Sequence, residues 1–99
     1  MDTKQEILDF LQSNKIYMQK HYFLTKVGLF GSFARGEQTA KSDVDLLIEI
    51  EQGTEHIHDL KISLSKYLTQ AFGRDVDIAR EKYLKPYAKN EILKDTVYV

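Results

Sequence analysis

Two aspartates, Asp43 and Asp45, stand two positions apart in a segment where polar and apolar residues alternate. On a strand, residues at this spacing leave the same face, so the two carboxylates would lie within reach of one shared ion. Two like charges this close raise each other's pKa unless a cation neutralises them. Carboxylate oxygens suit Mg²⁺, which completes its shell with water and phosphate oxygens. The alternative is a solvated pair on a polar strand face, since exposed acids are common.

A third aspartate, Asp77, favours the metal site over the solvated pair. It lies between Val76 and Ile78 in a short apolar segment, so its side chain should leave the face opposite the core. If its strand neighbours the strand of the first two aspartates, three carboxylates converge, and two ions about 3.5–4 Å apart could bind. Asp75 has the same parity and is the competing candidate, although its position beside Arg74 at the start of the strand favours a structural role.

Gly31 and Ser32 follow a short apolar run and precede a predicted brief helix. A glycine at such a junction lets the backbone approach an anion, and the first N–H groups of a helix point toward phosphate. The Ser32 hydroxyl could donate one more hydrogen bond. Arg35, one turn later, could reach a phosphate oxygen or pair with a nearby acid. The segment is not a P-loop, because the Gly-Lys-Ser/Thr ending is missing.

The elements that must position these residues follow from hydrophobic periodicity. Helices are predicted over residues 3–21 with a break near Ser13-Asn14, over 32–38 with an end near Gly36, over 55–72 with an end at Gly73, and from Pro86 onward. Strands are predicted over residues 24–30, 42–51 and 75–79, and the apolar tail 96–99 is expected to dock on the domain or on a partner. Because helices alternate with strands, we expect a small α/β or α+β domain in which helices pack on a short mixed β-sheet.

Composition sets the class of protein. The 99 residues suffice for one domain, residues 1–99, and leave a core small enough that a homodimer or hetero-oligomer contact would add stability. The net charge of -1 gives no basis for direct nucleic-acid binding or for membrane-surface binding. The chain has no cysteine, no apolar run long enough for a membrane span, and no signal-peptide pattern at its start. We therefore expect a cytoplasmic protein.

Taken together, the motifs are more specific than any one of them. The segments 31–37 (Gly-Ser-Phe-Ala-Arg-Gly-Glu), 42–46 (Ser-Asp-Val-Asp-Leu) and 76–78 (Val-Asp-Ile) occur in this order. The chain resembles the polymerase-β-type nucleotidyltransferase superfamily, and within it the minimal nucleotidyltransferase (MNT) proteins that are encoded beside HEPN-domain partners. The resemblance spans nearly the whole chain and has no departure at the glycine, the serine or the three aspartates.

The resemblance implies a role for each of these residues. Asp43, Asp45 and Asp77 would be the metal-binding and catalytic carboxylates, which hold two Mg²⁺ ions and, at Asp77, help to deprotonate the acceptor hydroxyl. Gly31 and Ser32 would hold the β- and γ-phosphates of ATP, with Arg35 and Ser42 as further nucleotide-binding residues. The chain would transfer AMP to a tyrosine of a HEPN ribonuclease toxin and act as its antitoxin, an acceptor that rests on analogy alone.

Other functions stay open at this stage. The domain could instead be a binding module that neutralises a HEPN partner by occlusion, which its small size favours. A metal-dependent nuclease would use similar acids but would not explain Gly31-Ser32. His56 and His58 point in different directions at a helix start, so they do not form a zinc-chelating pair. The sequence does not determine the nucleotide, the acceptor, the number of groups transferred or the oligomeric state.

Overall fold

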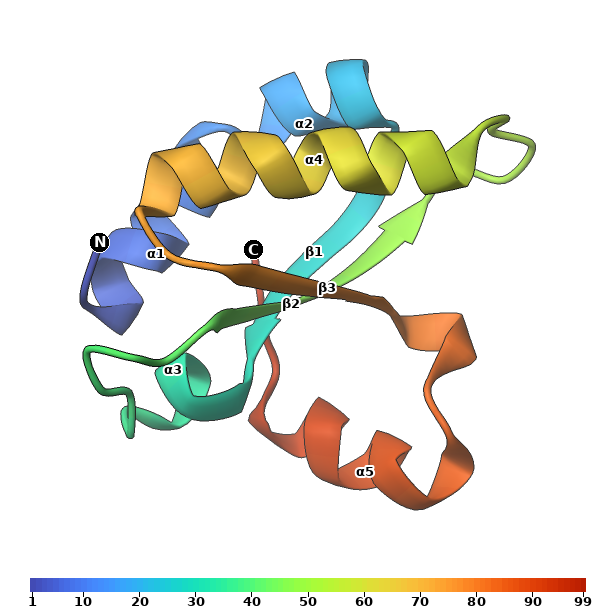
Figure 1. Cartoon of the computed structure of the whole chain (residues 1–99). Coiled ribbons are helices and arrows are strands. Elements are labelled where there is room, and N and C mark those ends of the chain that lie inside the picture. Colours follow the sequence, from blue (N-terminus) through green and yellow to red (C-terminus); the bar gives the residue numbers. More distant parts are fainter.

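The computed structural model describes all residues, 1–99, and contains one four-stranded sheet. The sheet lies at the centre of the molecule (Figure 1). The strands are β1 (Leu24–Phe30), β2 (Val44–Ile50), β3 (Val76–Arg80) and β4 (Val97–Tyr98), in the order β3-β2-β1-β4. β1 is antiparallel to β2 and to β4, whereas β2 and β3 are parallel. The expected mixed sheet is confirmed, and the tail that was expected to dock forms its short fourth strand.

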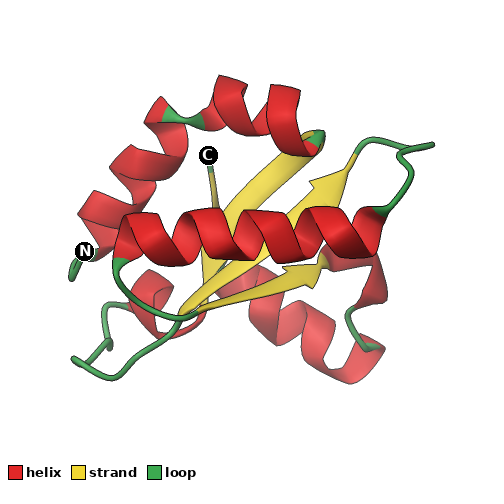
Figure 2. Cartoon of the chain, turned by 45° about the horizontal axis from the view of Figure 1, so that its top comes forward, coloured by secondary structure: helices red, strands yellow, loops and turns green.

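Five α-helices and one short 3-10 helix surround the sheet (Figure 2). They are α1 (Lys4–Ser13), α2 (Lys15–Tyr22), α3 (Gly31–Arg35), α4 (Ile57–Phe72), η1 (Glu81–Tyr83) and α5 (Pro86–Asp95). The predicted break at Ser13-Asn14 separates α1 from α2, and α3 and α4 end before Gly36 and Gly73 as predicted. None of the helices is both long and apolar enough to cross a membrane.

The core lies between one face of the sheet and helices α1, α2 and α4, which run along the same side of it in Figure 1. Alternate residues of β2 face this core, because side chains on a strand alternate between its two faces; they are Val44, Leu46, Ile48 and Ile50. The helices contribute apolar residues at helical spacing, such as Leu64 and Leu68 of α4. The opposite face of β2 carries Asp45, Leu47 and Glu49, and Leu47 is buried there although its neighbours on that face are acids.

Several boundaries differ by a few residues from those predicted, and the starts of β2 and α4 show why. β2 begins at Val44, two residues later than expected, so Asp43 precedes the strand. The helix expected from residue 55 begins at Ile57. In both cases the alternating or helical pattern continues into residues that lack the backbone hydrogen bonds of the element, and a pattern of side chains does not show where pairing stops.

The contact between β1 and β4 depends on a glycine. A Cβ atom at Gly28 would lie 2.7 Å from Thr96 Cγ2 and 2.8 Å from Tyr98 Cδ1, closer than side chains approach one another. Gly28 pairs with Leu47 on one side and with Tyr98 on the other, so the strand cannot shift easily to relieve the overlap. The C-terminal strand therefore packs closely only because residue 28 has no side chain.

We predict that Gly28→Ala lowers the free energy of unfolding by about 1–3 kcal/mol, the usual cost of overpacking. Urea denaturation measures this change. The same substitution in a Thr96→Ser, Tyr98→Ala background is the control, because that background lacks the atoms that would overlap. An equal loss in both backgrounds would contradict the close approach as the cause.

Candidate functional site

Asp45 and Asp77 are neighbours across the parallel pair of strands β2 and β3. In the register of this pair Asp45 lies opposite Asp77, and Val44 lies opposite Val76. Neighbouring strands are about 4.8 Å apart, and residues in register on parallel strands present their side chains to the same face. The sequence-based condition that the strand of Asp77 lies beside the strand of Asp45 is therefore confirmed.

Asp43 lies one residue before β2 and is exposed. The Val44 N–H that follows it donates to the Asp75 carbonyl at 2.9 Å, which begins the pairing of β2 with β3. Asp43 therefore lies at the end of the sheet where β2 begins, and its position is set by the preceding loop as much as by the strand. Asp75 is also exposed, and its observed contact is this backbone one, which agrees with the structural role expected for it.

The carboxylate of Asp45 rests directly against Gly31. Gly31 has φ +74, in the left-handed region that glycine adopts without strain. A Cβ atom built at Gly31 would collide with Oδ2 of Asp45. Gly31 is thus required twice, for the turn from β1 into α3 and for the space that Asp45 occupies. This contact joins the glycine-serine motif to the first of the paired carboxylates.

The electrostatics at Asp45 are unfavourable for a carboxylate. Its pKa is raised above the ordinary value, first by burial and then by the negative charges of Asp77 and Asp43, while Arg35 lowers it. The ion pairs of the protein involve none of these three aspartates. The result is a partly buried, uncompensated patch of negative charge on the sheet face opposite the core.

The remaining predicted binding residues make contacts within the chain. Arg35 pairs with Glu37 (Nε to Oε2, 3.1 Å) and with Asp95 (Nη1 to Oδ2, 3.6 Å). Of the two kinds of partner expected for it, a phosphate or a nearby acid, the structure shows the acid. The Ser42 hydroxyl accepts the Thr39 N–H at 2.8 Å and closes a turn before Asp43. Ser32 is the half-buried second residue of α3.

No three or more histidine, cysteine, aspartate or glutamate side chains are gathered closely enough to hold a metal ion. The paired carboxylates nevertheless fit Mg²⁺ in their chemistry, because this ion is commonly held by one or two carboxylates together with substrate phosphates and water. The raised pKa of Asp45 comes first from burial and then from the charges of Asp77 and Asp43, and a cation would neutralise the second of these causes. The described residues thus offer a partial shell that phosphate oxygens would have to complete.

One residue at the site was not singled out from the sequence. Arg74 lies between α4 and β3, and its side chain contacts the loop that leads to Asp43. Its only indication in the sequence is an arginine placed between the helix-ending Gly73 and an acidic strand. Nothing in a one-dimensional pattern shows that its hydrogen bonds reach residues more than thirty positions away.

Comparison with known proteins gives concordant matches. A sequence profile described as "Nucleotidyltransferase domain" matches residues 6–99. The protein adenylyltransferase MntA of Thermococcus cleftensis is 32% identical over 99 residues, which cover 100% of this chain and 98% of that protein.

Two solved structures share the fold. A structure described as a minimal nucleotidyltransferase has a TM-score of 0.77 at 30% identity and is matched over 98% of this chain and 95% of that one. A toxin-antitoxin crystal structure with AMP-PNP has a TM-score of 0.66 at 21% identity, over 96% of this chain and 70% of that one. At the latter identity the likeness concerns the fold alone.

We predict that Asp45→Asn raises the thermal midpoint of the metal-free protein at neutral pH. A carboxyl whose pKa is raised on folding destabilises the charged native state above that pKa, and the penalty disappears as the pH falls toward the ordinary value of 3.8. The difference between variant and wild type should therefore be largest at neutral pH and vanish in acid, as measured by thermal unfolding across pH.

Glu49→Gln is the matched control for this prediction. Glu49 lies on the same strand and the same face, but its carboxylate is paired with Arg80 at 3.3 Å. Its substitution should lower the midpoint rather than raise it, because it leaves the buried Arg80 without its ionic partner. If both variants shift the midpoint in the same direction, the electrostatic argument for Asp45 fails.

Proposed function

Because this chain belongs to the nucleotidyltransferase domain family and is an enzyme of the protein adenylyltransferase type, we propose that it transfers AMP from ATP to a hydroxyl group of a partner protein. The observation that carries the proposal is the placement of Asp45 in register with Asp77 and in contact with Gly31. This arrangement puts carboxylates that can hold a cation directly beside backbone that can approach a phosphate.

Each predicted residue has a task in this reaction. Asp45 and Asp77, together with Asp43 at the start of β2, would hold Mg²⁺, and a second ion is expected when the triphosphate is bound. The bound Mg²⁺ supplies charge neutralisation on the triphosphate and on the reacting oxygens. Gly31 and Ser32 bind the β- and γ-phosphates, because their N–H groups begin α3 and have no partner within that helix.

Arg35 and Ser42 complete the nucleotide site. The ion pairs of Arg35 with Glu37 and Asp95 involve partly exposed side chains, so each is weak and a phosphate can replace it at small cost. The turn that Ser42 closes with Thr39 fixes the residue immediately before Asp43. Ser42 thus supports the site through the loop as well as through its hydroxyl.

The chemical step is an in-line displacement. The acceptor oxygen attacks the α-phosphorus of ATP, a new O–P bond forms, and the bond between the α-phosphorus and its bridging oxygen to the β-phosphate breaks. Pyrophosphate leaves with that oxygen. Asp77 accepts the proton of the acceptor hydroxyl, for which its exposure on the open face of β3 is suitable.

The partner is proposed to be a toxin. The 32% identity with the protein adenylyltransferase MntA supports an adenine nucleotide as the substrate. An antitoxin role is our extension from the toxin-antitoxin structure with AMP-PNP, which shares the fold. The resemblance to MNT proteins extends this to a tyrosine of a HEPN ribonuclease, in the cytoplasm, where ATP is available.

The test is transfer of label from ATP. Incubation of the protein with α-labelled ATP, Mg²⁺ and the HEPN protein encoded beside it should give a labelled partner. Asp43→Asn should lower the rate about 100-fold or more, the scale of losing one electrostatic contact to the transition state. Glu51→Gln, which also removes one exposed carboxylate near an end of β2, should leave the rate unchanged.

An Asp43→Asn, Asp45→Asn double variant separates catalysis from occlusion. If the adenylyl transfer neutralises the toxin, cells that express the double variant with the toxin should stop growing. Full protection by this variant, at equal expression and with intact binding of the partner, would overturn the catalytic role and favour neutralisation by occlusion.

A further inference from the structure

The loop between α3 and β2, residues 36–43, delivers Asp43 to the site but has few backbone hydrogen bonds of its own. Gly36 and Glu37 donate to carbonyls of α3, and Ser42 donates to Thr39 at 3.1 Å. Most of its residues are exposed, and no strand pairs with it before Val44. Its path therefore has to be held by side-chain contacts.

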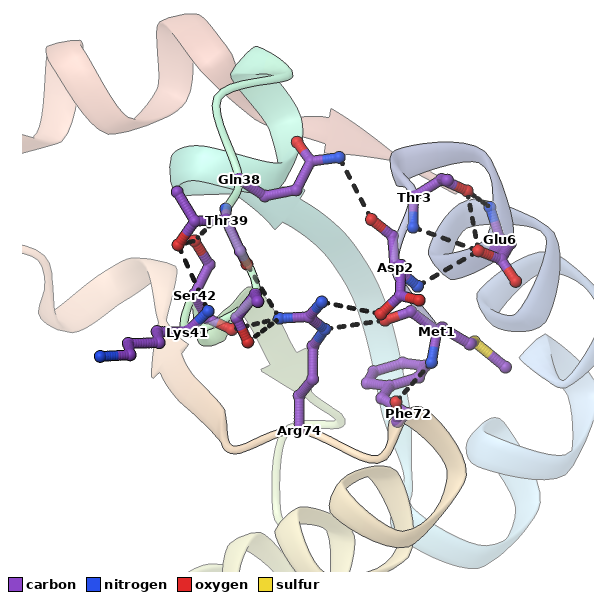
Figure 3. A network of polar contacts seen from close by, with 11 residues as sticks. Met1, Asp2, Thr3, Glu6, Gln38, Thr39, Lys41, Ser42, Phe72 and Arg74 are labelled. Atoms are coloured by element: carbon purple, nitrogen blue, oxygen red, sulfur yellow. Dashed lines mark hydrogen bonds and ion pairs between the residues drawn. The ribbon is translucent and has the colours of Figure 1, made fainter.

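Arg74 supplies three of those contacts, beside the turn closed by Thr39 and Ser42 and the bond from Gln38 to the Asp2 carbonyl (Figure 3). Its Nη1 donates to the carbonyls of Thr39, Ala40 and Ser42, at 3.1 Å in each case. Its Nε donates to the Met1 carbonyl at 2.8 Å, and Nη2 pairs with the Asp2 carboxylate at 2.8 Å. The side chain of Arg74 is only 10% exposed, so the guanidinium itself is largely removed from water.

The same side chain also meets the other two parts of the site. The guanidinium carbon lies 5.1 Å from the ring centroid of Phe33, a buried residue of the helix that begins with Gly31-Ser32. The backbone of Arg74 belongs to the segment that leads into β3, three residues before Asp77. Arg74 thus contacts α3, which begins with Gly31-Ser32, and the loop that leads to Asp43. It also lies in the segment that leads into the strand of Asp77.

We propose that Arg74 is the positioning residue of the nucleotide site: it holds the loop that carries Asp43 to the start of β2. This inference rests on the proposed function for its consequence in catalysis, but its structural part can be measured alone. A guanidinium suits this role because it carries five N–H donors that point in fixed directions, so it can bind several acceptors at once. The ammonium group of lysine has its three donors on one nitrogen atom and cannot reach the same set of acceptors.

The acid partner contributes little to this role. Asp2 has an 85% exposed side chain, so its ion pair with Arg74 is screened by water. The three loop carbonyls are the contacts that matter for Asp43. We therefore expect Asp2→Asn to leave the loop and the nucleotide site unchanged.

Arg74→Lys and Arg80→Lys form a matched pair for the test. Arg80 is also buried and stacks on an aromatic ring, that of Tyr83, but lies at the other end of β3 and contacts Glu49 rather than the loop. Hydrogen exchange followed by mass spectrometry in the nucleotide-free protein should show about tenfold faster exchange in Arg74→Lys at the hydrogen-bonded amides of this region, those of Thr39, Ser42 and Val44. The exchange of these residues in Arg80→Lys and Asp2→Asn should match that of the wild type.

Adenylyl transfer by the full chain gives the second readout. Arg74→Lys should raise KM for Mg·ATP about 10–100-fold, the usual cost of losing a group that orients metal ligands, with a smaller change in kcat, and Arg80→Lys should not. Unchanged loop exchange in Arg74→Lys, or KM effects equal to those of Arg80→Lys at equal thermal stability, would overturn the proposal. Wild-type protein that transfers no label would instead overturn the proposed function, while the exchange measurement would still decide whether Arg74 holds the loop.

Discussion

The parallel pairing of β2 with β3 is the main constraint on the rest of the fold. Two parallel strands cannot be joined by a tight turn, so the chain needs a crossover connection, and α4 provides it. The crossover packs Leu64, Leu68 and Phe72 against the core face of the sheet. This burial fixes the register in which Asp45 stands opposite Asp77 on the other face. A slip of one residue would turn Asp77 toward the core, which the packing of Val76 and Ile78 against the core opposes.

This register brings like charges together, which is unfavourable for folding. Asp45 is partly buried, it rests on Gly31, and the charges of Asp77 and Asp43 add to the effect of burial on its pKa. Three of the five observed ion pairs involve an arginine beside this region, yet Arg74 pairs with Asp2 and Arg35 pairs with Glu37 and Asp95. The unfavourable charge cluster is tolerated because the core on the opposite face is built from long apolar side chains that are nearly fully buried.

Local patterns were enough to predict the five α-helices and strands β1 to β3. The 3-10 helix was not predicted, and distant contacts account for the other features that were missed. The alternation through Val44, Leu46 and Ile48 predicted both the strand and the face of Asp45. The predicted strand wrongly included Asp43, because the side-chain alternation continues where the pairing with β3 has not yet begun. The sequence did not predict that β2 and β3 are neighbours, since their pairing depends on how α4 packs. The tail 96–99 was recognised as apolar, but its pairing with β1 depends on the missing side chain of Gly28, a contact across some seventy residues.

The contacts of Arg74 explain how a site so rich in acids can have a buried arginine nearby and still keep its carboxylates unpaired. A guanidinium placed against Asp43 or Asp77 would neutralise their charge and compete with a divalent cation for the same oxygens. In this protein the donors of Arg74 are directed to backbone carbonyls of Met1, Thr39, Ala40 and Ser42 and to the exposed Asp2. Carbonyl oxygens carry only partial charge, so they bind the guanidinium without removing charge from the site. The arginine orders the loop, and the negative potential of the three aspartates remains for a cation and the phosphates that accompany it.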